Sequence, residues 1–171
     1  MMKKYRYLLV IGIIVLDQVV KLMVRSSMFV GQRIPVIDGV FHLTYVQNRG
    51  AAFSLFYGQN VFLIFVPTIA VLLAIWYMEK HLKEHWTMIL ALSLLVSGGI
   101  GNLIDRGLFR FVTDMFDFRI WPVFNVADIA VCVGAGFLIL YTFLYTKDST
   151  AIKETDSESS ESSEEISKNE I

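Results

Sequence analysis

The sequence predicts an all-α membrane protein with four transmembrane helices, a small extracytoplasmic β-element and a disordered C-terminal tail. The first observation is composition: 55% of the 171 residues are hydrophobic, whereas soluble domains carry about 45–50% apolar residues. The second is that these residues gather in four long runs, and a helix needs about 20 residues to cross a bilayer. The third is charge: residues 1–146 hold 12 Lys+Arg and 8 Asp+Glu, whereas residues 147–171 hold 3 Lys+Arg and 8 Asp+Glu. The acidic tail is therefore a separate compositional unit.

The chain divides into a membrane domain, residues 1–146, and a tail, residues 147–171. The predicted helices span about residues 7–24, 61–78, 86–104 and 123–145. They are helices rather than barrel strands because the runs are continuously apolar, and because backbone in lipid must satisfy its own hydrogen bonds. The tail is rich in Ser and Glu and buries too little apolar surface to offset its ordering entropy. We expect it to be a solvated, disordered extension.

The first apolar run follows a basic start formed by Lys3, Lys4 and Arg6. No small-residue cleavage site follows the run, so we expect an uncleaved helix rather than a signal peptide. Lys and Arg residues near the membrane number six on each side, and this count therefore gives no orientation. The basic start favours a cytoplasmic N-terminus. Both termini would then be cytoplasmic, and the loops at about 25–60 and 105–122 would face outward.

The first outer loop contains a predicted β-element at about residues 31–56. Asp38-Gly39 is a turn signal, and Phe41, Leu43 and Tyr45 alternate behind it on one face. This pattern indicates a small hairpin or sheet lying on the membrane surface. A turn at Asn48-Arg49-Gly50 follows. A purely structural turn is the simpler interpretation; the functional one is that Asn48 hydrogen-bonds a substrate backbone while Gly50 allows a close backbone approach.

Polar residues at membrane depth are the informative ones, because a charge there costs several kcal/mol unless it is paired or functional. Asp17 and Lys21 are four residues apart on one helical face, so they can pair. The pair is either a structural unit or the support of a polar site between helices.

A second polar group lies at the outer end of the third run. Gly98 and Gly101 allow another helix to approach closely. Asn102 shares a helical face with Asp105 and also with Arg106, which brings an amide, a carboxylate and a guanidinium together. Packing with an interfacial Asp–Arg pair is the alternative interpretation.

The last polar group opens the fourth run, where Asn125 and Asp128 share a face just after Pro122, a residue suited to a helix start. Asp114 precedes them in a loop that must return to the same membrane face, so the carboxyl groups of Asp114 and Asp128 can meet at the rim. Two adjacent carboxyls share one proton, and such a pair can activate water and polarise a carbonyl. Peptide hydrolysis is therefore one interpretation.

Two other functions use the same acids. A proton-coupled transporter would use Asp17, Asp114 and Asp128 as a relay, and a membrane scaffold would tolerate Asn at the last two positions. His81-Leu82-Lys83-Glu84-His85 matches the H-x-x-E-H zinc pattern. It lies in a short connection, though, and His42, the remaining histidine, is expected across the membrane. Cys132 is expected to be a small buried hydrophobe.

The polar groups together resemble, in order, the motif blocks of the lipoprotein signal peptidases, the signal peptidase II family. The blocks are Asp17–Lys21, Asn48–Ser54, Gly98–Arg106, Val112–Asp114 and Phe124–Asp128. The resemblance covers about residues 5–145, and its last three blocks are the specific ones. Thr113 stands where the family usually has an apolar residue, the segment from Asp114 to Asp128 looks short, and Asp117 is a nearby rival for Asp114.

The resemblance implies an aspartyl endopeptidase of the bacterial cytoplasmic membrane, with its active site toward the outer face. Such an enzyme removes signal peptides from prolipoproteins before a diacylglyceryl-modified cysteine. It implies Asp114 and Asp128 as the catalytic pair, with no metal or other cofactor. Partners would be the lipid-modified prolipoprotein, membrane lipid and globomycin-type inhibitors, but no nucleic acid. The residues implied in substrate binding or site support are Asp17, Lys21, Asn48, Gly50, Gly98, Gly101, Asn102, Asp105, Arg106, Asn125 and Ala127.

Overall fold

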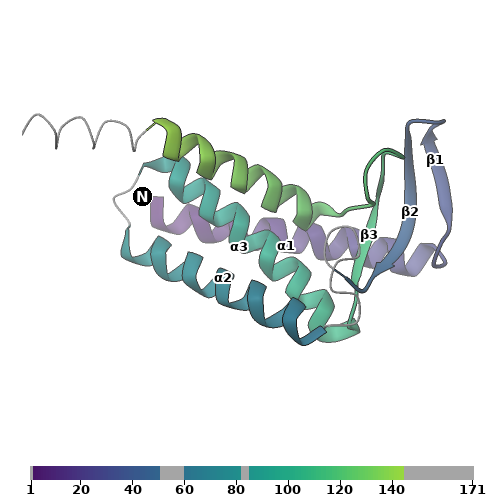
Figure 1. The fold of residues 1–171 in the computed structure, drawn as a ribbon, viewed down its shortest axis with the longest axis horizontal. Coiled ribbons are helices and arrows are strands. Elements are labelled where there is room, and N and C mark those ends of the chain that lie inside the picture. Colours follow the sequence, from purple (N-terminus) through teal and green to yellow (C-terminus); the bar gives the residue numbers. More distant parts are fainter. Residues whose placement is uncertain (1, 51–59, 82–84, 145–171) are drawn as a thin grey trace, which may run out of the picture.

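The structure, a computed structural model, describes residues 2–50, 60–81 and 85–144. This part of the chain contains four helices that are long and apolar enough to cross a membrane. They are α1 (Met2–Ser27), α2 (Asn60–Lys80), α3 (Trp86–Phe109) and a fourth helix, Val126–Leu144, which carries no label in Figure 1. The prediction of four apolar helices with a small β-element is confirmed.

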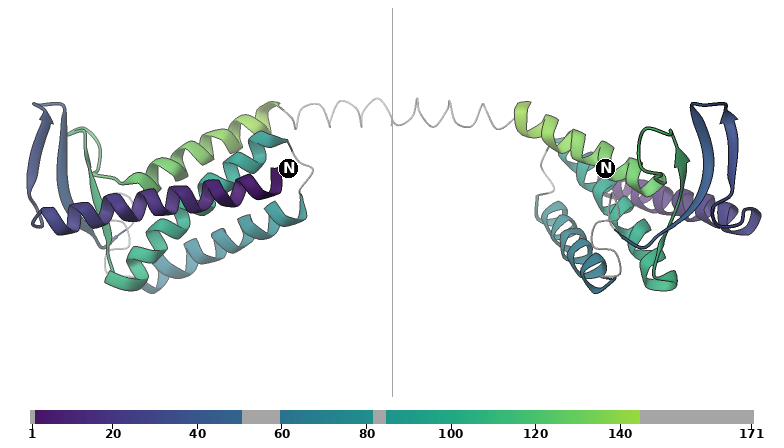
Figure 2. Two further views of the ribbon diagram at one scale, coloured as in Figure 1. Left: turned by 180° about the vertical axis from the view of Figure 1, so that it is seen from behind. Right: turned by 45° about the vertical axis from the view of Figure 1, so that its right-hand side comes forward.

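The helices run side by side as a bundle, and the strands stand at one end of it (Figures 1 and 2). The start of α1 and the end of the fourth helix lie together at the opposite end. This arrangement follows from an even number of antiparallel spans. It leaves the polar ends of α1, α3 and the fourth helix next to the sheet.

The sheet has three antiparallel strands in the order β1-β2-β3, namely β1 (Arg33–Ile37), β2 (Phe41–Asn48) and β3 (Val112–Asp117). The predicted turn is present, with Gly39 at φ 70°, a conformation that glycine adopts without strain. The expectation that Asp114 lies in a loop is wrong, because Val112–Asp117 pairs with β2 as a strand.

The alternation expected along β2 is interrupted. A register shift lies between Leu43 and Val46, and the buried side chains are His42, Thr44 and Tyr45 rather than the Phe41, Leu43 and Tyr45 set. A bulge adds one residue to a strand and so turns later side chains to the other face. Tyr45 thereby packs with Met115 of β3 and Val24 of α1, and this cluster holds the sheet against the end of α1.

The helix bounds differ from the predicted ones at the outer end of the bundle. α3 continues to Phe109, so that Asp105 and Arg106 lie in its last turns rather than beyond it. The fourth helix begins at Val126 instead of about 123, because Phe124 forms an isolated antiparallel bridge with Phe116 of β3. The predicted tail and the C-terminal half of the Asn48–Ser54 block fall outside the described residues.

Two glycines of α3 bring its neighbours close. A Cβ at Gly98 would lie against the carbonyl oxygen of Ala127 and 2.7 Å from Cγ2 of Val131, both on the fourth helix. A Cβ at Gly101 would lie 2.7 Å from an Asp17 carboxylate oxygen of α1. The absence of side chains at both positions therefore sets the distance at which the three helices meet.

We predict that Gly98→Ala lowers the free energy of unfolding by about 1–3 kcal/mol, the usual cost of overpacking a close contact. Gly12→Ala is the matched control, because Gly12 also lies within a helix but has open space around it. It should stabilise by about 0.5–1 kcal/mol through helix propensity alone. Thermal unfolding of the purified protein in detergent measures both, and equal midpoints for the two variants would contradict the prediction.

Candidate active site

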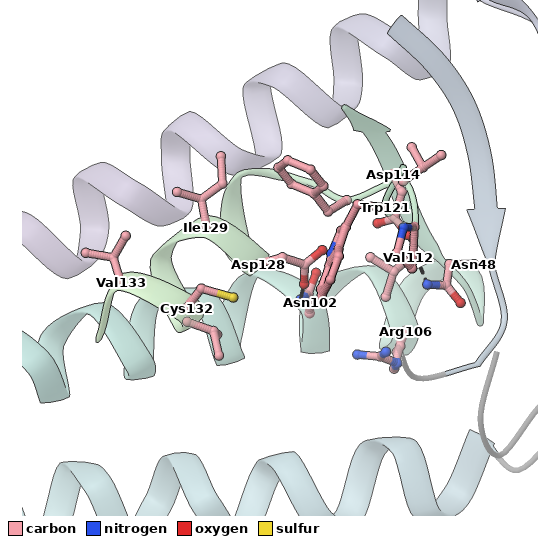
Figure 3. Close-up of a pocket in the computed structure, with 14 residues that line it drawn as sticks. Asn48, Asn102, Arg106, Val112, Asp114, Trp121, Asp128, Ile129, Cys132 and Val133 are labelled. Carbon is pink, nitrogen blue, oxygen red and sulfur yellow. Dashed lines mark hydrogen bonds between the residues drawn. The ribbon is translucent and has the colours of Figure 1, made fainter. Parts of the chain in front are cut away.

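A pocket of about 540 Å³ lies where the fourth helix meets the sheet (Figure 3). Its lining residues are Asn48, Asn102, Arg106, Val112, Asp114, Trp121, Pro122, Val123, Phe124, Asp128, Ile129, Val131, Cys132 and Val133. Most of the wall is apolar, while the polar groups converge at the sheet end. Ile129 and Val133 are 43% and 45% exposed and lie within a helix suited to span a membrane, so part of the apolar wall lies on the outer surface of the bundle.

Asp114 and Asp128 both line this pocket, although they come from different elements (Figure 3). Asp114 is 2% exposed on β3, and Asp128 lies in the first turn of the fourth helix. The side-chain amide of Asn125 donates to Asp114 Oδ1 at 2.7 Å, and the backbone N–H of Asn125 donates to Asp128 Oδ2 at 3.1 Å. One residue therefore holds both carboxyl groups, which the sequence predicts would meet.

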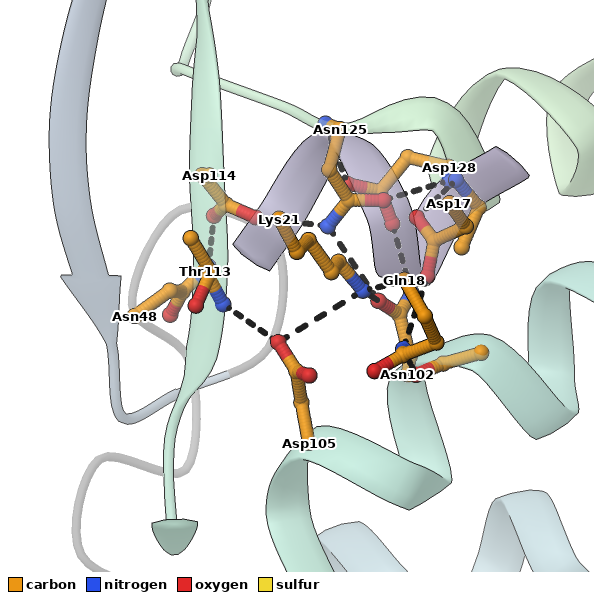
Figure 4. Close-up of polar contacts among 12 residues, drawn as sticks. Asp17, Gln18, Lys21, Asn48, Asn102, Asp105, Thr113, Asp114, Asn125 and Asp128 are labelled. Atoms are coloured by element: carbon orange, nitrogen blue, oxygen red, sulfur yellow. Dashed lines mark hydrogen bonds and ion pairs between the residues drawn. The ribbon is translucent and has the colours of Figure 1, made fainter. Parts of the chain in front are cut away.

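Three side-chain amides surround the two carboxyls (Figure 4). Besides Asn125, the amide nitrogen of Asn48 donates to Asp114 Oδ2 at 2.9 Å. The amide nitrogen of Asn102 donates to Asp128 Oδ1 at 2.8 Å. Every oxygen of the pair thus accepts one hydrogen bond, and its remaining lone pairs are left for a proton, for water or for a substrate.

The orientation of each amide is determined by what its oxygen accepts. The oxygen of Asn48 accepts the backbone N–H of Gly50, and that of Asn125 accepts the backbone N–H of Asp128. The oxygen of Asn102 accepts from the Lys21 ammonium at 3.0 Å. Backbone N–H groups and ammonium groups are donors only, so each NH2 group must face the carboxyls. Each of the three amides therefore has one favoured orientation, with its NH2 group toward the carboxyls.

The start of the fourth helix contributes to the same arrangement. Asn125 and Asp128 exchange hydrogen bonds as a capping box, since each side chain accepts the other's backbone N–H. The next free N–H, that of Ala127, donates to Asp17 Oδ1 at 2.9 Å. Asp17 and Asp128 are thus placed at the positive end of the helix dipole, where carboxylates are favoured.

Lys21 lies fully buried behind the pocket and has three partners (Figure 4). Its ammonium lies 2.9 Å from Asp17 Oδ2, as the i,i+4 spacing predicts, and 3.6 Å from Asp105 Oδ2. The third partner is Asn102. Lys21 lies outside the pocket lining, but it orients the Asn102 amide that donates to Asp128. Lys21 therefore acts on the site through Asn102.

Asp105 and Arg106, expected together, point in different directions. Asp105 is fully buried and pairs with Lys21 and with Arg25. Arg106 lines the pocket and donates to the carbonyl oxygen of Gly50 at 3.2 Å. Their adjacency in sequence places them on either side of Asn102, so one supports the site from behind while the other faces its interior.

Burial, and after it the negative charge of Asp128, raise the pKa of Asp114 to about 7. The amides of Asn48 and Asn125 and the charge of Lys21 act in the opposite direction. Asp114 is therefore protonated over part of the neutral range. This is the behaviour expected when two carboxyls lie close together away from water.

Asp117, the rival to Asp114, lies away from the pocket lining. Burial alone would raise its pKa. However, bonds from the Thr44 hydroxyl and the Arg119 backbone N–H, with the charges of Arg33 and Arg119, hold the pKa of Asp117 below its usual value. Such a carboxylate stays ionised and paired. Its surroundings fit a structural role in the sheet.

Sequence reasoning missed several site residues. Arg25 continues the Asp17, Lys21 series by four more positions, which is a signal that could have found it, and it pairs with Asp105 at 3.2 Å. Trp121 lines the pocket without a sequence signal. The expectation that Cys132 is buried is wrong: it is exposed on the fourth helix and lines the pocket, because an apolar residue here covers bilayer-facing surface rather than a protein core.

The H-x-x-E-H pattern falls partly outside the described residues, at 82–84. His85 caps the start of α3, where its ring nitrogen accepts the N–H of Thr87. His42 lies in β2, in the sheet at the other end of the bundle. Within the residues that the structure describes, no group of three His, Cys, Asp or Glu side chains could hold a metal ion.

Comparison with known proteins identifies similar chains across most of this length. The model of a family described as signal peptidase (SPase) II matches residues 9–144. A lipoprotein signal peptidase of Halothermothrix orenii is 45% identical over 82% of this chain and 97% of its own length. One from Clostridioides difficile is 43% identical over 83% and 97%. A solved structure described as a bacterial membrane enzyme superposes with a TM-score of 0.81 at 28% identity, covering 85% of this chain and 92% of that chain.

We predict opposite pH dependences of stability for two Asp→Asn variants. The pKa of Asp114 is raised to about 7, so the folded protein loses stability as pH rises from about 4 to about 7, and Asp114→Asn escapes this loss. The pKa of Asp117 is lowered, so its carboxylate stabilises the fold above its unfolded pKa, and that contribution disappears as pH falls through the lower folded value.

Thermal unfolding in detergent across pH 3–8 checks this pair, where roughly 1.4 kcal/mol corresponds to each unit of pKa shift. Relative to the parent, Asp114→Asn should gain stability toward pH 8, whereas Asp117→Asn should be destabilised there and match the parent at the acid end. The same slope for both variants would contradict the assignment of the two environments.

Proposed function

The chain belongs to the signal peptidase II family, and we propose that it is an aspartic endopeptidase that removes signal peptides from bacterial prolipoproteins. Cleavage would occur just before the diacylglyceryl-modified cysteine. As a member of this family the chain is a peptidase, and its four apolar helices make it a multi-pass membrane protein. The observation that carries the aspartic mechanism is the convergence of Asp114 and Asp128 on one pocket with a largely apolar wall.

In the proposed mechanism Asp128 is the base and Asp114 the acid. The Asp128 carboxylate takes a proton from water, whose oxygen attacks the scissile carbonyl carbon while Asp114 gives its proton to the carbonyl oxygen. The tetrahedral intermediate then collapses. Asp128 passes its proton to the departing amine, and Asp114 recovers a proton from the intermediate's hydroxyl. Both acids return to their starting states.

Two features support this division of roles. The pKa of Asp114 is raised to about 7, mainly by its burial, so it can carry the shared proton at neutral pH. Asp128 accepts from the Asn102 side-chain amide and from the backbone N–H of Asn125, and these bonds orient its carboxylate to take a proton from water. Two interacting carboxyls titrate as a pair, and the values measured in an assay belong to the pair.

The other pocket residues supply binding surface in this proposal. Arg106, Asn48 and Gly50 lie where a substrate backbone would enter from the sheet side. The apolar wall along Ile129 and Val133 suits the hydrophobic signal peptide and the acyl chains attached to the cysteine. The proposal places the termini in the cytoplasm and the pocket at the outer face of the membrane. Globomycin-type inhibitors are expected to occupy the same pocket.

The transporter and scaffold interpretations make different demands of the two acids. A proton relay from Asp17 to the pocket would require Asp17 to reach the pocket, but it lies outside the pocket lining and is held by Lys21 and by the Ala127 N–H. A scaffold would have no need of a pocket with two carboxyls held at fixed directions. Family membership and this arrangement both favour the peptidase.

We predict that Asp114→Asn and Asp128→Asn each lower cleavage of a diacylglyceryl-modified prolipoprotein by about 10²–10⁴-fold, the usual contribution of a general acid or base. The assay uses the purified full chain in lipid-containing micelles, with product separated by electrophoresis. Asp117→Asn is the matched control and should keep near-parental cleavage. EDTA should have no effect, because carboxyls alone activate the water. Proton-driven flux in proteoliposomes without cleavage would support the transporter instead.

We predict that kcat falls as pH rises above about 7, because the acid form of the pair is lost there. The measurement is a pH–rate profile under saturating substrate, with folding checked at each pH. A rate that stays constant from pH 6 to 9 would contradict the assignment of Asp114 as the proton donor.

A further inference from the structure

Arg25 lies in the last turns of α1, one helical turn beyond Lys21, and its guanidinium crosses to the sheet. Its Nη1 atom donates to the Thr113 hydroxyl at 3.0 Å and to Asp105 Oδ1 at 3.2 Å. The same guanidinium lies over the ring of Phe109, 4.6 Å from its centroid. Its side chain is only 16% exposed, so α1, α3 and β3 all enclose it.

These contacts form a closed triangle around the residue that precedes Asp114. The backbone N–H of Thr113 donates to Asp105 Oδ2 at 2.8 Å, while the other oxygen of Asp105 accepts from Arg25. Asp105 thus holds the backbone of Thr113 and Arg25 holds its side chain, and Arg25 and Asp105 are hydrogen-bonded to each other. Thr113 is fully buried, which limits competition from water.

Successive side chains of a strand point to opposite faces. Thr113 points toward Arg25 and Asp105 on one side of β3, and Asp114 points into the pocket on the other. A rotation of β3 about its axis would move both side chains together. The triangle behind the strand therefore determines the direction in which the Asp114 carboxyl faces.

We infer that Arg25 and Thr113 are positioning residues for the reaction. The hydrogen bond between them directs the Asp114 carboxyl toward the substrate, which neither residue contacts. This inference rests on the proposed function of the pocket. Loss of the bond should lower kcat rather than raise KM, because the acid is misaligned in the reacting complex while the binding surface is kept.

The test is Thr113→Val, which keeps the shape and branching of the side chain and removes its hydroxyl. Val suits a buried strand position, so the fold should be retained, as a thermal unfolding midpoint near the parent's will show. In the prolipoprotein cleavage assay kcat should fall on the order of 10²-fold, the effect of misplacing a reacting group by about 1 Å, with KM unchanged. Thr113→Ser restores the hydroxyl and should recover most of kcat.

A second variant, Arg25→Gln, removes the charge from the other side of the same bond. Because both changes break one contact, the double variant should be no slower than the slower single variant. Arg33→Gln is the control, since Arg33 pairs with Asp117 at 3.4 Å, at the far end of β3, and should leave kcat unchanged.

The outcomes separate this inference from the proposed function. Absence of cleavage by the parent chain would overturn the proposed function itself. Parental cleavage with an unchanged kcat in Thr113→Val would overturn the positioning role alone. The positioning role would also be overturned if Thr113→Ser were as slow as Thr113→Val, or if the two single effects multiplied in the double variant.

Discussion

A single buried ammonium, that of Lys21, connects the parts of this molecule that must stay in register. An unpaired charge in such a place would cost several kcal/mol, so its partners cannot be separated freely. Asp17 also accepts the Ala127 N–H of the fourth helix, and Asn102 also contacts Asp128. Asp105 also accepts the backbone N–H of β3. Three helices and the sheet thus meet through one cation.

The buried charged side chains behind the pocket balance one another. Asp17 and Asp105 are matched by Lys21 and Arg25 through direct contacts. In the pocket the two carboxyls interact with each other, with polar amides and with the charges of Lys21 and Arg106. The pKa of Asp114 is raised because its burial and the charge of Asp128 outweigh the groups that lower it. Fixed donors aimed at a site where charge changes are an efficient way to stabilise a transition state, because they need no rearrangement.

Local patterns in the sequence were enough to predict the helices and the Asp17–Lys21 pair, because hydrophobic runs and i,i+4 spacing are properties of one segment. β3 was not predictable in the same way. Val112–Asp117 is short, and its partner Phe41–Asn48 lies on the far side of two helices in the sequence. A polar residue at position 113 departs from the family pattern, and the structure explains it: the Thr113 hydroxyl accepts from Arg25 where α1 meets β3.

The exposed pocket residues Ile129 and Val133 also bear on how the affinity for a membrane-borne substrate must be expressed. On the proposed function, a lipid-linked peptide would reach the pocket through the bilayer and would be diluted by lipid or detergent rather than by buffer volume. The Michaelis constant then scales with the mole fraction of substrate among lipid or detergent. Doubling the detergent at constant substrate would halve occupancy of an unsaturated site, so rates from different micelles become comparable only on a surface-concentration scale.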